Sequence, residues 1–143
     1  MPRKRSKPDP TPQDGRDTAL RLLSRREHSA AELKHKLARR GHEEQQAQDI
    51  VDGLGEAGWQ SDARYAEMLL RNRVEQGYGP LRIRADLEAV RVPDTVIRVA
   101  FEEAEVDWAA RACAVHVRKF KLPPQGAAEW QKQYRYLATR GFE

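Results

Sequence analysis

The stretch Ser29-Ala-Ala-Glu-Leu-Lys-His-Lys-Leu-Ala-Arg-Arg-Gly41 decides how this chain folds. Its first four residues have the form of a capping box, in which a serine and a glutamate three residues later satisfy free N–H groups at the start of a helix. Leu33 and Leu37 follow one helical turn apart, and Gly41 stands where a glycine often ends a helix. The stretch therefore predicts a helix from about residue 30 to residue 40.

Helical patterns continue on both sides of this stretch. Apolar residues recur at three- and four-residue steps, which is typical of amphipathic helices. We expect one helix to begin near Asp17 or Thr18, and later ones within residues 47–57, 61–76, 80–90, 94–104, 107–120 and around 130–137. No segment shows a convincing strand-like alternation of apolar and polar residues. The sequence therefore predicts an all-α protein.

Matching residues recur at an interval of 50 positions. Leu37, Leu87 and Leu137 form one such series, and the other consists of Leu20, Leu70 and Phe120. The order of caps, helices and breakers repeats with them, which predicts tandem three-helix repeats at residues 18–58 and 59–105, with an incomplete third repeat at 106–143. Repeats of this kind stack and share a core, so we expect an elongated, curved array. The opening residues 1–17 are rich in proline and basic side chains and are expected to form a disordered tail.

The composition is polar and basic. Hydrophobic residues make up 39% of the chain and charged residues 34%, with a net charge of +4 and a pI near 9.4. Residues 106–143 hold seven basic and three acidic side chains, which permits nucleic acid or another acidic surface as a partner. Cys113 is the single cysteine, so no intramolecular disulfide can form, and we expect it to be a core side chain. With no apolar run long enough to span a membrane and no apolar stretch of a secretory signal, the sequence predicts a soluble, cytoplasmic protein. We also expect it to be a monomer.

Sequence motifs typical of catalysis or cofactor binding lie on structural elements that do not suit those functions. Gly53-Leu-Gly-Glu-Ala-Gly58 has the spacing of a dinucleotide-binding loop, yet it ends a helix instead of joining a strand to one. Cys113 and His116 lie three residues apart on a helix expected to face the core, which favours a packing role over catalysis. Three histidines recur every seven residues without cysteines nearby, and we expect them to be solvated or capping: His28, His35 and His42. We therefore predict no catalytic residue, no cofactor and no metal site, and hence no enzyme.

Basic side chains are the remaining candidates for function. They occur in all three predicted repeats and include Lys34, Lys36, Arg39, Arg40, Arg64, Arg71, Arg73, Arg82, Arg84, Arg118, Lys119, Lys121, Lys132, Arg135 and Arg140. A series along an array could follow a phosphate backbone or the acidic groove of a polymeric protein. Direct binding of single- or double-stranded DNA is one alternative. Another is a scaffold that binds a protein through Trp59 or Trp130, although both are expected to be core residues.

One segment resembles a known family. Gly58-Trp-Gln-Ser-Asp-Ala-Arg-Tyr-Ala66, followed by Arg73 and by Gly77-Tyr-Gly-Pro-Leu-Arg-Ile83, is similar to the central signature of the RecX family. Leu33-Lys-His-Lys-Leu-Ala-Arg-Arg-Gly41 resembles the segment that precedes that signature. The resemblance implies three repeats of a three-helix unit and binding within the groove of the RecA filament. It also implies inhibition of the RecA ATPase, strand-exchange and co-protease activities, in recombination, DNA repair and the SOS response.

The resemblance also points to individual residues. Arg64, Tyr65 and Arg73 belong to the signature, and we expect Tyr65 to be largely structural and the two arginines to make contacts. The full set of expected contacts with the RecA filament is Arg39, Arg40, Arg64, Tyr65, Arg71, Arg73, Arg82, Arg84, Arg118, Lys119, Lys121, Lys132 and Arg135. Two departures from the pattern stand out. Arg91 replaces the glycine that closes the second helix of the other repeats, and Glu143 comes before the helix that would follow Phe142.

Overall fold

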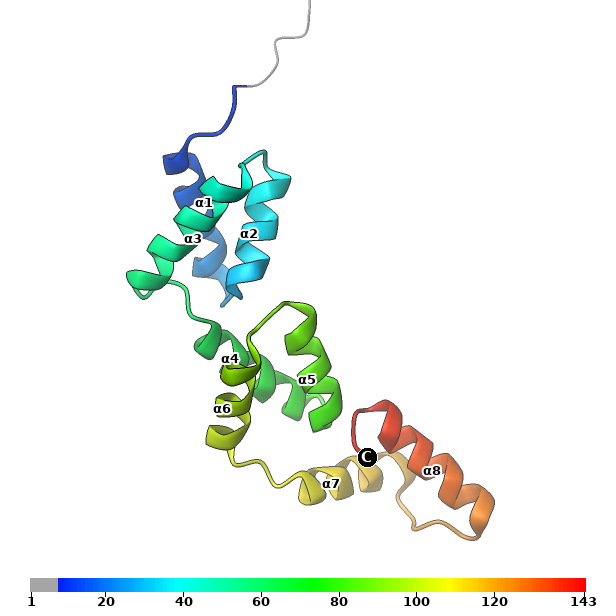
Figure 1. Cartoon of the computed structure of the whole chain (residues 1–143). Helices are drawn as coiled ribbons and strands as arrows, with labels where there is room; N and C mark the ends of the chain where they lie inside the picture. Colours follow the sequence, from blue (N-terminus) through cyan, green and yellow to red (C-terminus); the bar gives the residue numbers. More distant parts are fainter. Residues whose placement is uncertain (1–7) are drawn as a thin grey trace, which may run out of the picture. The chain divides into compact units, whose positions relative to one another are not determined.

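The computed structural model describes residues 8–143, which form two compact units (Figure 1). The first unit extends to Asp62 and the second covers Ala63–Glu143. The helices of the first unit are α1 (Pro12–Arg25), α2 (Ala30–Arg39) and α3 (Glu44–Glu56). From the unit boundary onward follow α4 (Asp62–Glu75), α5 (Pro80–Ala89), α6 (Asp94–Ala104), α7 (Trp108–Phe120) and α8 (Ala127–Thr139). The described residues contain no strand, and the predicted all-α class is confirmed.

Helix α1 begins earlier than the sequence patterns indicated. It starts at Pro12, so the expectation that structure begins near Asp17 or Thr18 is wrong. The Thr11 hydroxyl accepts from the Asp14 N–H at 3.1 Å, and the Asp14 carboxylate accepts from the Thr11 N–H at 3.0 Å. This capping box closes the first turn and lets Pro12 stand at the start of the helix. The remainder of the expected tail, residues 1–7, lies outside the described residues.

The first unit is a three-helix bundle around an apolar core. Helix α2 is capped as predicted: the Ser29 hydroxyl accepts from the Glu32 N–H, and the Glu32 carboxylate accepts from the Ser29 N–H, both at 3.1 Å. Its two leucines are completely buried with residues from α1 and α3; the core comprises Ala19, Leu33, Leu37, Ala47, Ile50, Val51 and Leu54. The apolar pattern that predicted the helices therefore also marks the face that each one buries.

Two of the three regularly spaced histidines are buried, which contradicts the expectation that they are solvated or capping. His28 is 2% exposed and His42 is 6% exposed, whereas His35 is exposed. His42 reaches the α1 backbone at Gly15, where an added Cβ would lie 2.6 Å from the imidazole. Its own Nδ1 bonds to the Gln46 side chain. The spacing of these histidines did not reveal their burial, because the loops around α2 turn His28 and His42 inward.

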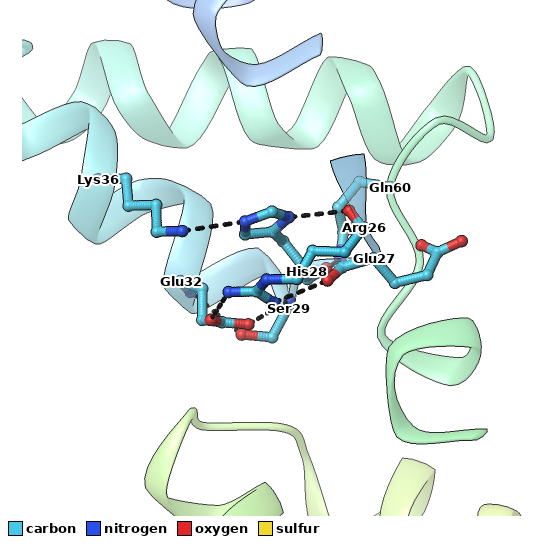
Figure 2. A network of polar contacts seen from close by, with 7 residues as sticks. All are labelled: Arg26, Glu27, His28, Ser29, Glu32, Lys36 and Gln60. Carbon is cyan, nitrogen blue, oxygen red and sulfur yellow. Dashed lines mark hydrogen bonds and ion pairs between the residues drawn. The ribbon is translucent and has the colours of Figure 1, made fainter. Parts of the chain in front are cut away.

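His28 lies in a network of polar groups beside the start of α2 (Figure 2). Its Nδ1 is 3.0 Å from the carbonyl oxygen of Arg26, and its Nε2 is 3.0 Å from the ammonium group of Lys36. Because an ammonium group only donates, Nε2 accepts and Nδ1 carries the proton, so the ring is neutral. Burial, together with the charges of Arg26 and Lys36, lowers the pKa of His28 below its ordinary value.

The segment after α3 is tied to this network. The amide of Gln60 donates to the carbonyl oxygen of His28 at 3.3 Å and to the carboxylate of Asp62 at 3.1 Å. Asp62 also accepts from the backbone N–H of Ala30 at 2.8 Å, which satisfies a free donor in the first turn of α2. Gln60 and Asp62, both part of the signature segment, therefore have structural roles in the first unit.

The second unit has its own core between α4, α5 and α6. The buried residues are Tyr65, Ala66, Leu69, Leu70, Val74, Ile83, Leu87, Val92 and Ile97. Arg91, which follows α5, adopts the left-handed conformation with φ 56°, as Gly41 and Gly141 do with φ 96° and 98°. The same turn thus recurs at 50-residue intervals, although the side chain of Arg91 makes it less favourable at that position.

The hairpin of α7 and α8 attaches to the start of α5. The Gly79 N–H donates to the carbonyl oxygen of Arg140 at 2.7 Å, and the Leu81 N–H donates to that of Gly141 at 3.0 Å. The backbones are so close that a Cβ on Gly79 would lie 2.5 Å from the Gly141 carbonyl group. Phe142 is buried beside this contact. No side chain caps α5, so the loop after α8 provides the missing acceptors.

Three residues expected in the core are exposed. Cys113 is exposed, and Trp59 and Trp130 are 58% and 56% exposed. In the described part of the chain, α7 contains no fully buried residue, because its hairpin packs as two helices without a third layer over them. Trp130 instead stacks on Tyr134 one turn later, with ring centroids 5.3 Å apart. Apolar spacing identified the helices but overestimated how much of the hairpin is covered.

Candidate interaction surface

A group of arginines gathers in the second unit where α4, α5 and the end of α8 meet. The Arg73 Nε lies 3.0 Å from one Asp86 carboxylate oxygen, and the Arg82 Nε lies 3.2 Å from the other. The guanidinium groups of Arg82 and Arg140 lie over the Tyr78 ring, 4.9 and 4.1 Å from its centroid. We call Arg73, Tyr78, Arg82, Asp86 and Arg140 the arginine cluster.

The cluster has more positive than negative charge. Arg73 and Arg82 share the single carboxylate of Asp86, and with Arg140 the three guanidinium groups leave a surplus of about two positive charges. The Asp86 pairs are only partly exposed, so solvent screens them less than it would a fully exposed pair. Arg140 is held further by donating from Nε to the Gly77 carbonyl oxygen at 3.2 Å and from Nη2 to that of Gln76. Fixed cationic groups of this kind are complementary to an acidic surface.

The two signature residues on α4 differ in exposure. Arg64 is exposed, whereas Tyr65 is 5% exposed and belongs to the core of the second unit. This burial supports the structural role expected for Tyr65 and leaves little of its surface for a partner. Arg64 keeps the exposure that a contact residue requires.

Other predicted contact residues of the second unit are engaged individually. Arg71 forms an exposed pair with Glu67 at 2.9 Å, one helical turn before it. Arg84 lies over the Phe101 ring at 5.3 Å, a contact that joins α5 to α6. An exposed ion pair contributes little to stability, so Arg71 can exchange Glu67 for another acidic partner. Arg84, in contrast, also helps to pack α5 against α6.

The α7–α8 hairpin carries five predicted contact residues. Arg118 and Lys119 face the α4 side of the hairpin and line a cavity there. Lys121 ends α7 in the left-handed conformation, and Lys132 and Arg135 are exposed on α8. Residues 108–142 hold seven basic side chains against the single carboxylate of Glu129.

Arg39 and Arg40 lie in the first unit, at the end of α2. Both are exposed, and their charges lie near the negative end of the helix dipole, which favours them there. The arginine cluster and the cavity of the hairpin contain neither of them.

Sequence patterns missed two cations that the fold brings to this region. Arg140 was part of the basic surface but was not among the expected contacts, although Arg140-Gly141 repeats the Arg40-Gly41 pair and marks the same turn. Arg111 was not singled out at all, since its ion-pair partner Glu75 is 36 positions earlier and no local motif signals the pairing.

The geometry offers little for catalysis or metal binding in the part of the chain that the structure describes. No group of three or more histidine, cysteine, aspartate or glutamate side chains there could hold a metal ion. His116 bonds through Nε2 to the Gln133 amide and lies against Phe120. Within residues 8–143, no helix is both long and apolar enough to cross a membrane.

Family models match the chain in three consecutive parts. They describe the first, second and third three-helix domains of RecX and match residues 16–54, 61–100 and 105–143. Among similar proteins, the regulatory protein RecX of Halorhodospira halophila is 46% identical over 128 residues, which cover 89% of this chain and 80% of that protein. The regulatory protein RecX of Chromohalobacter salexigens is 43% identical and is covered to 84% of its length, with 90% of this chain matched.

Solved structures of RecX share the fold. The crystal structure of RecX from Lactobacillus salivarius superposes with a TM-score of 0.79 and covers 92% of this chain and 88% of that one. Another crystal structure of regulatory protein RecX gives a TM-score of 0.75, with 92% of this chain and 69% of that chain covered. Sequence identities are 20% and 21%, so these likenesses concern the arrangement of helices.

Proposed function

The chain belongs to the RecX family of regulatory proteins, and from this membership we propose that it binds the RecA filament and restrains it. Binding would inhibit the ATPase, strand-exchange and co-protease activities of RecA in recombination, DNA repair and the SOS response. A regulator of a DNA-bound filament acts in the cytoplasm, and we propose that this one does so as a monomer and without catalysis of its own.

The observation that carries this proposal is the arginine cluster. Arg73 and Arg82 share one carboxylate, and Arg140 is fixed by backbone carbonyl groups and by Tyr78. Cations held in place lose little conformational entropy on binding, which favours a partner with regularly placed acidic groups. A filament repeats its surface along its axis, so several modest contacts would add up to high avidity.

The test is a titration of DNA-dependent ATP hydrolysis by RecA with the purified chain. We expect the wild-type chain to inhibit hydrolysis and the double variant Arg73→Gln with Arg82→Gln to need at least about tenfold more protein, as loss of about 1.4 kcal/mol would require. A matched control removes two exposed charges outside the predicted contacts, Arg21→Gln with Arg98→Gln, and should inhibit like the wild type. Equal inhibition by all three proteins would remove the arginine cluster from the interface.

Direct binding of nucleic acid is a second candidate, supported by the seven basic side chains and one carboxylate of residues 108–142. Contacts with phosphates release counterions, so such binding would weaken steeply with salt. An electrophoretic mobility shift without RecA separates the two functions. Tight binding to bare DNA at physiological salt, with no effect on RecA ATP hydrolysis, would favour the second candidate.

A further inference from the structure

A cavity of about 470 Å³ opens in the second unit, where the end of α4 meets α7 and α8. Its wall includes Glu75 of α4, five residues of α7 and the end of α8. Four cationic side chains line it, namely Arg111, Arg118, Lys119 and Arg140. Glu75 is the single acidic residue among the lining side chains.

The charges around this cavity are poorly balanced. Arg111 reaches Glu75 at 3.6 Å, and both side chains are largely exposed, so the pair is weak. Arg118 has no ion-pair partner among residues 8–143, and Lys119 lies over the Tyr136 ring at 5.3 Å. Three positive charges therefore remain uncompensated around one opening, where they repel one another unless an anion lies between them.

Two of the cations are held in position. Arg140 donates to the carbonyl oxygens of Gln76 and Gly77, which fixes its guanidinium group against the turn after α4. Gly77 has φ 85°, and a Cβ there would lie 3.1 Å from the Arg140 Nη2. Tyr136, which lies beside Lys119, is itself packed edge-on against Phe120 with centroids 5.4 Å apart. Preorganised cations of this kind bind an anion without first having to be ordered.

We propose that this cavity binds a phosphate group, supplied either by a nucleic-acid backbone or by a small phosphate compound such as a nucleotide. A phosphate monoester or diphosphate carries more than one negative charge and several acceptor oxygens, which matches a site with three uncompensated cations. Guanidinium groups, of which the cavity has three, bind phosphate oxygens in a planar, two-point geometry. A volume of about 470 Å³ is large enough for a diphosphate group.

The proposal is independent of RecA binding. Arg140 belongs to both the arginine cluster and the cavity, but Arg73 and Arg82, whose replacement tests the RecA proposal, do not line the cavity. Phosphate binding can therefore be measured on the purified chain alone, and either proposal can fail without the other.

The experiment measures binding of three probes to the full chain: pyrophosphate and ATP by calorimetry, and a fluorescent 20-nucleotide oligothymidylate by anisotropy. The test variant is Arg118→Gln with Lys119→Gln, which removes two cavity cations that do not hold the hairpin to α5. The matched control is Lys132→Gln with Arg135→Gln, which removes the same charge from α8 outside the cavity. Circular dichroism should show the same helicity and melting temperature for all three proteins.

We expect the wild type to bind at least one probe and the test variant to bind it at least about tenfold more weakly, while the control changes the affinity by less than about twofold. Binding of pyrophosphate or ATP identifies a small phosphate compound as the ligand, and binding of the oligothymidylate alone identifies a nucleic-acid backbone. Equal weakening by the two variants would show that net charge alone attracts phosphate, and would overturn the proposal. No binding of any probe at about 1 mM would overturn it as well.

Discussion

The backbone N–H of Gly79 donates to the carbonyl oxygen of Arg140 at 2.7 Å, so residues 61 positions apart close the start of α5 together. The contact leaves no room for a side chain, since a Cβ on Gly79 would lie 2.5 Å from the backbone of Gly141 and Phe142. It fixes the α7–α8 hairpin to the rest of the second unit. It also positions Arg140, which belongs to both the arginine cluster and the phosphate cavity.

Replacing Gly79 by alanine should loosen the hairpin. Insertion of a methyl group into so close a contact should destabilise the second unit by about 2 kcal/mol. We expect a lower urea midpoint and faster hydrogen exchange of α8 amides, measured by mass spectrometry. The glycine at position 53 provides the control, because a Cβ there would meet nothing within 4 Å. Gly53→Ala should stabilise its helix by up to about 1 kcal/mol, and a loss of stability there would contradict the steric argument.

Replacing Arg91 by glycine should stabilise the second unit. Arg91 holds φ 56° after α5, a conformation that disfavours side chains by about 1 kcal/mol. Glycine removes that strain, although the greater freedom of the unfolded chain offsets part of the gain. We expect the thermal midpoint to rise for Arg91→Gly and to stay level or fall for Arg91→Ala. An equal rise in both variants would assign the effect to the lost arginine side chain and not to the backbone.

The stability of the first unit should fall as the solution becomes mildly acidic. Burial and the nearby charges of Arg26 and Lys36 lower the pKa of His28, so the unfolded chain takes up a proton that the folded one resists. Stability is therefore full above the ordinary histidine pKa of about 6.5 and is lost below it, by up to about 1.4 kcal/mol per pH unit, until the lowered pKa is reached. Urea unfolding between pH 7.5 and pH 5 measures this slope of the free energy of unfolding against pH.

The control for this pH dependence is exposed His35. His28→Gln should remove the slope between about pH 6.5 and pH 5, whereas His35→Gln should leave it unchanged. Glu32 contributes in a separate window. Burial opposes its ionisation, but hydrogen bonds from Arg26 and Ser29 together with the Arg26 charge outweigh it and lower the pKa. That contribution is therefore lost only below about pH 4.5. An unchanged slope in His28→Gln would show that another group causes it.

Replacing Tyr65 or Arg64 should weaken inhibition of RecA in both cases, but only the Tyr65 variant should lose stability. Tyr65→Ala opens a cavity in the core and should destabilise the second unit by about 3 kcal/mol, so its inhibition of ATP hydrolysis fails because the unit unfolds. Arg64→Gln should weaken inhibition while the melting temperature stays within about 2 °C of the wild type, as surface substitutions usually do. Full inhibition by a folded Arg64→Gln variant would exclude Arg64 from the interface.

Local sequence patterns were sufficient to predict the helices, because caps and apolar spacing act within a few residues. The capping box of Ser29 and Glu32 is present as predicted. A similar box at Thr11 and Asp14 was overlooked, since an aspartate takes the place of the usual glutamate and prolines surround it. The left-handed turns at Gly41, Arg91 and Gly141 follow the 50-residue recurrence.

Features that depend on contacts between distant segments could not be predicted in this way. The burial of His28 requires Gln60 and Lys36 around it, and the cavity requires the end of α4 beside α7 and α8. The exposure of Trp130 was missed for the opposite reason, since apolar residues at helical spacing indicate a buried face only when another element covers it.

The closure of α5 by the loop after α8 also sets an order of events during synthesis. When α5 leaves the ribosome, its first N–H groups have only water to accept them, because Arg140 and Gly141 have not yet been translated. Nascent α5 is thus held by its apolar face and by the pair of Arg73 with Asp86, and its first turn becomes fixed only after some 50 further residues have emerged.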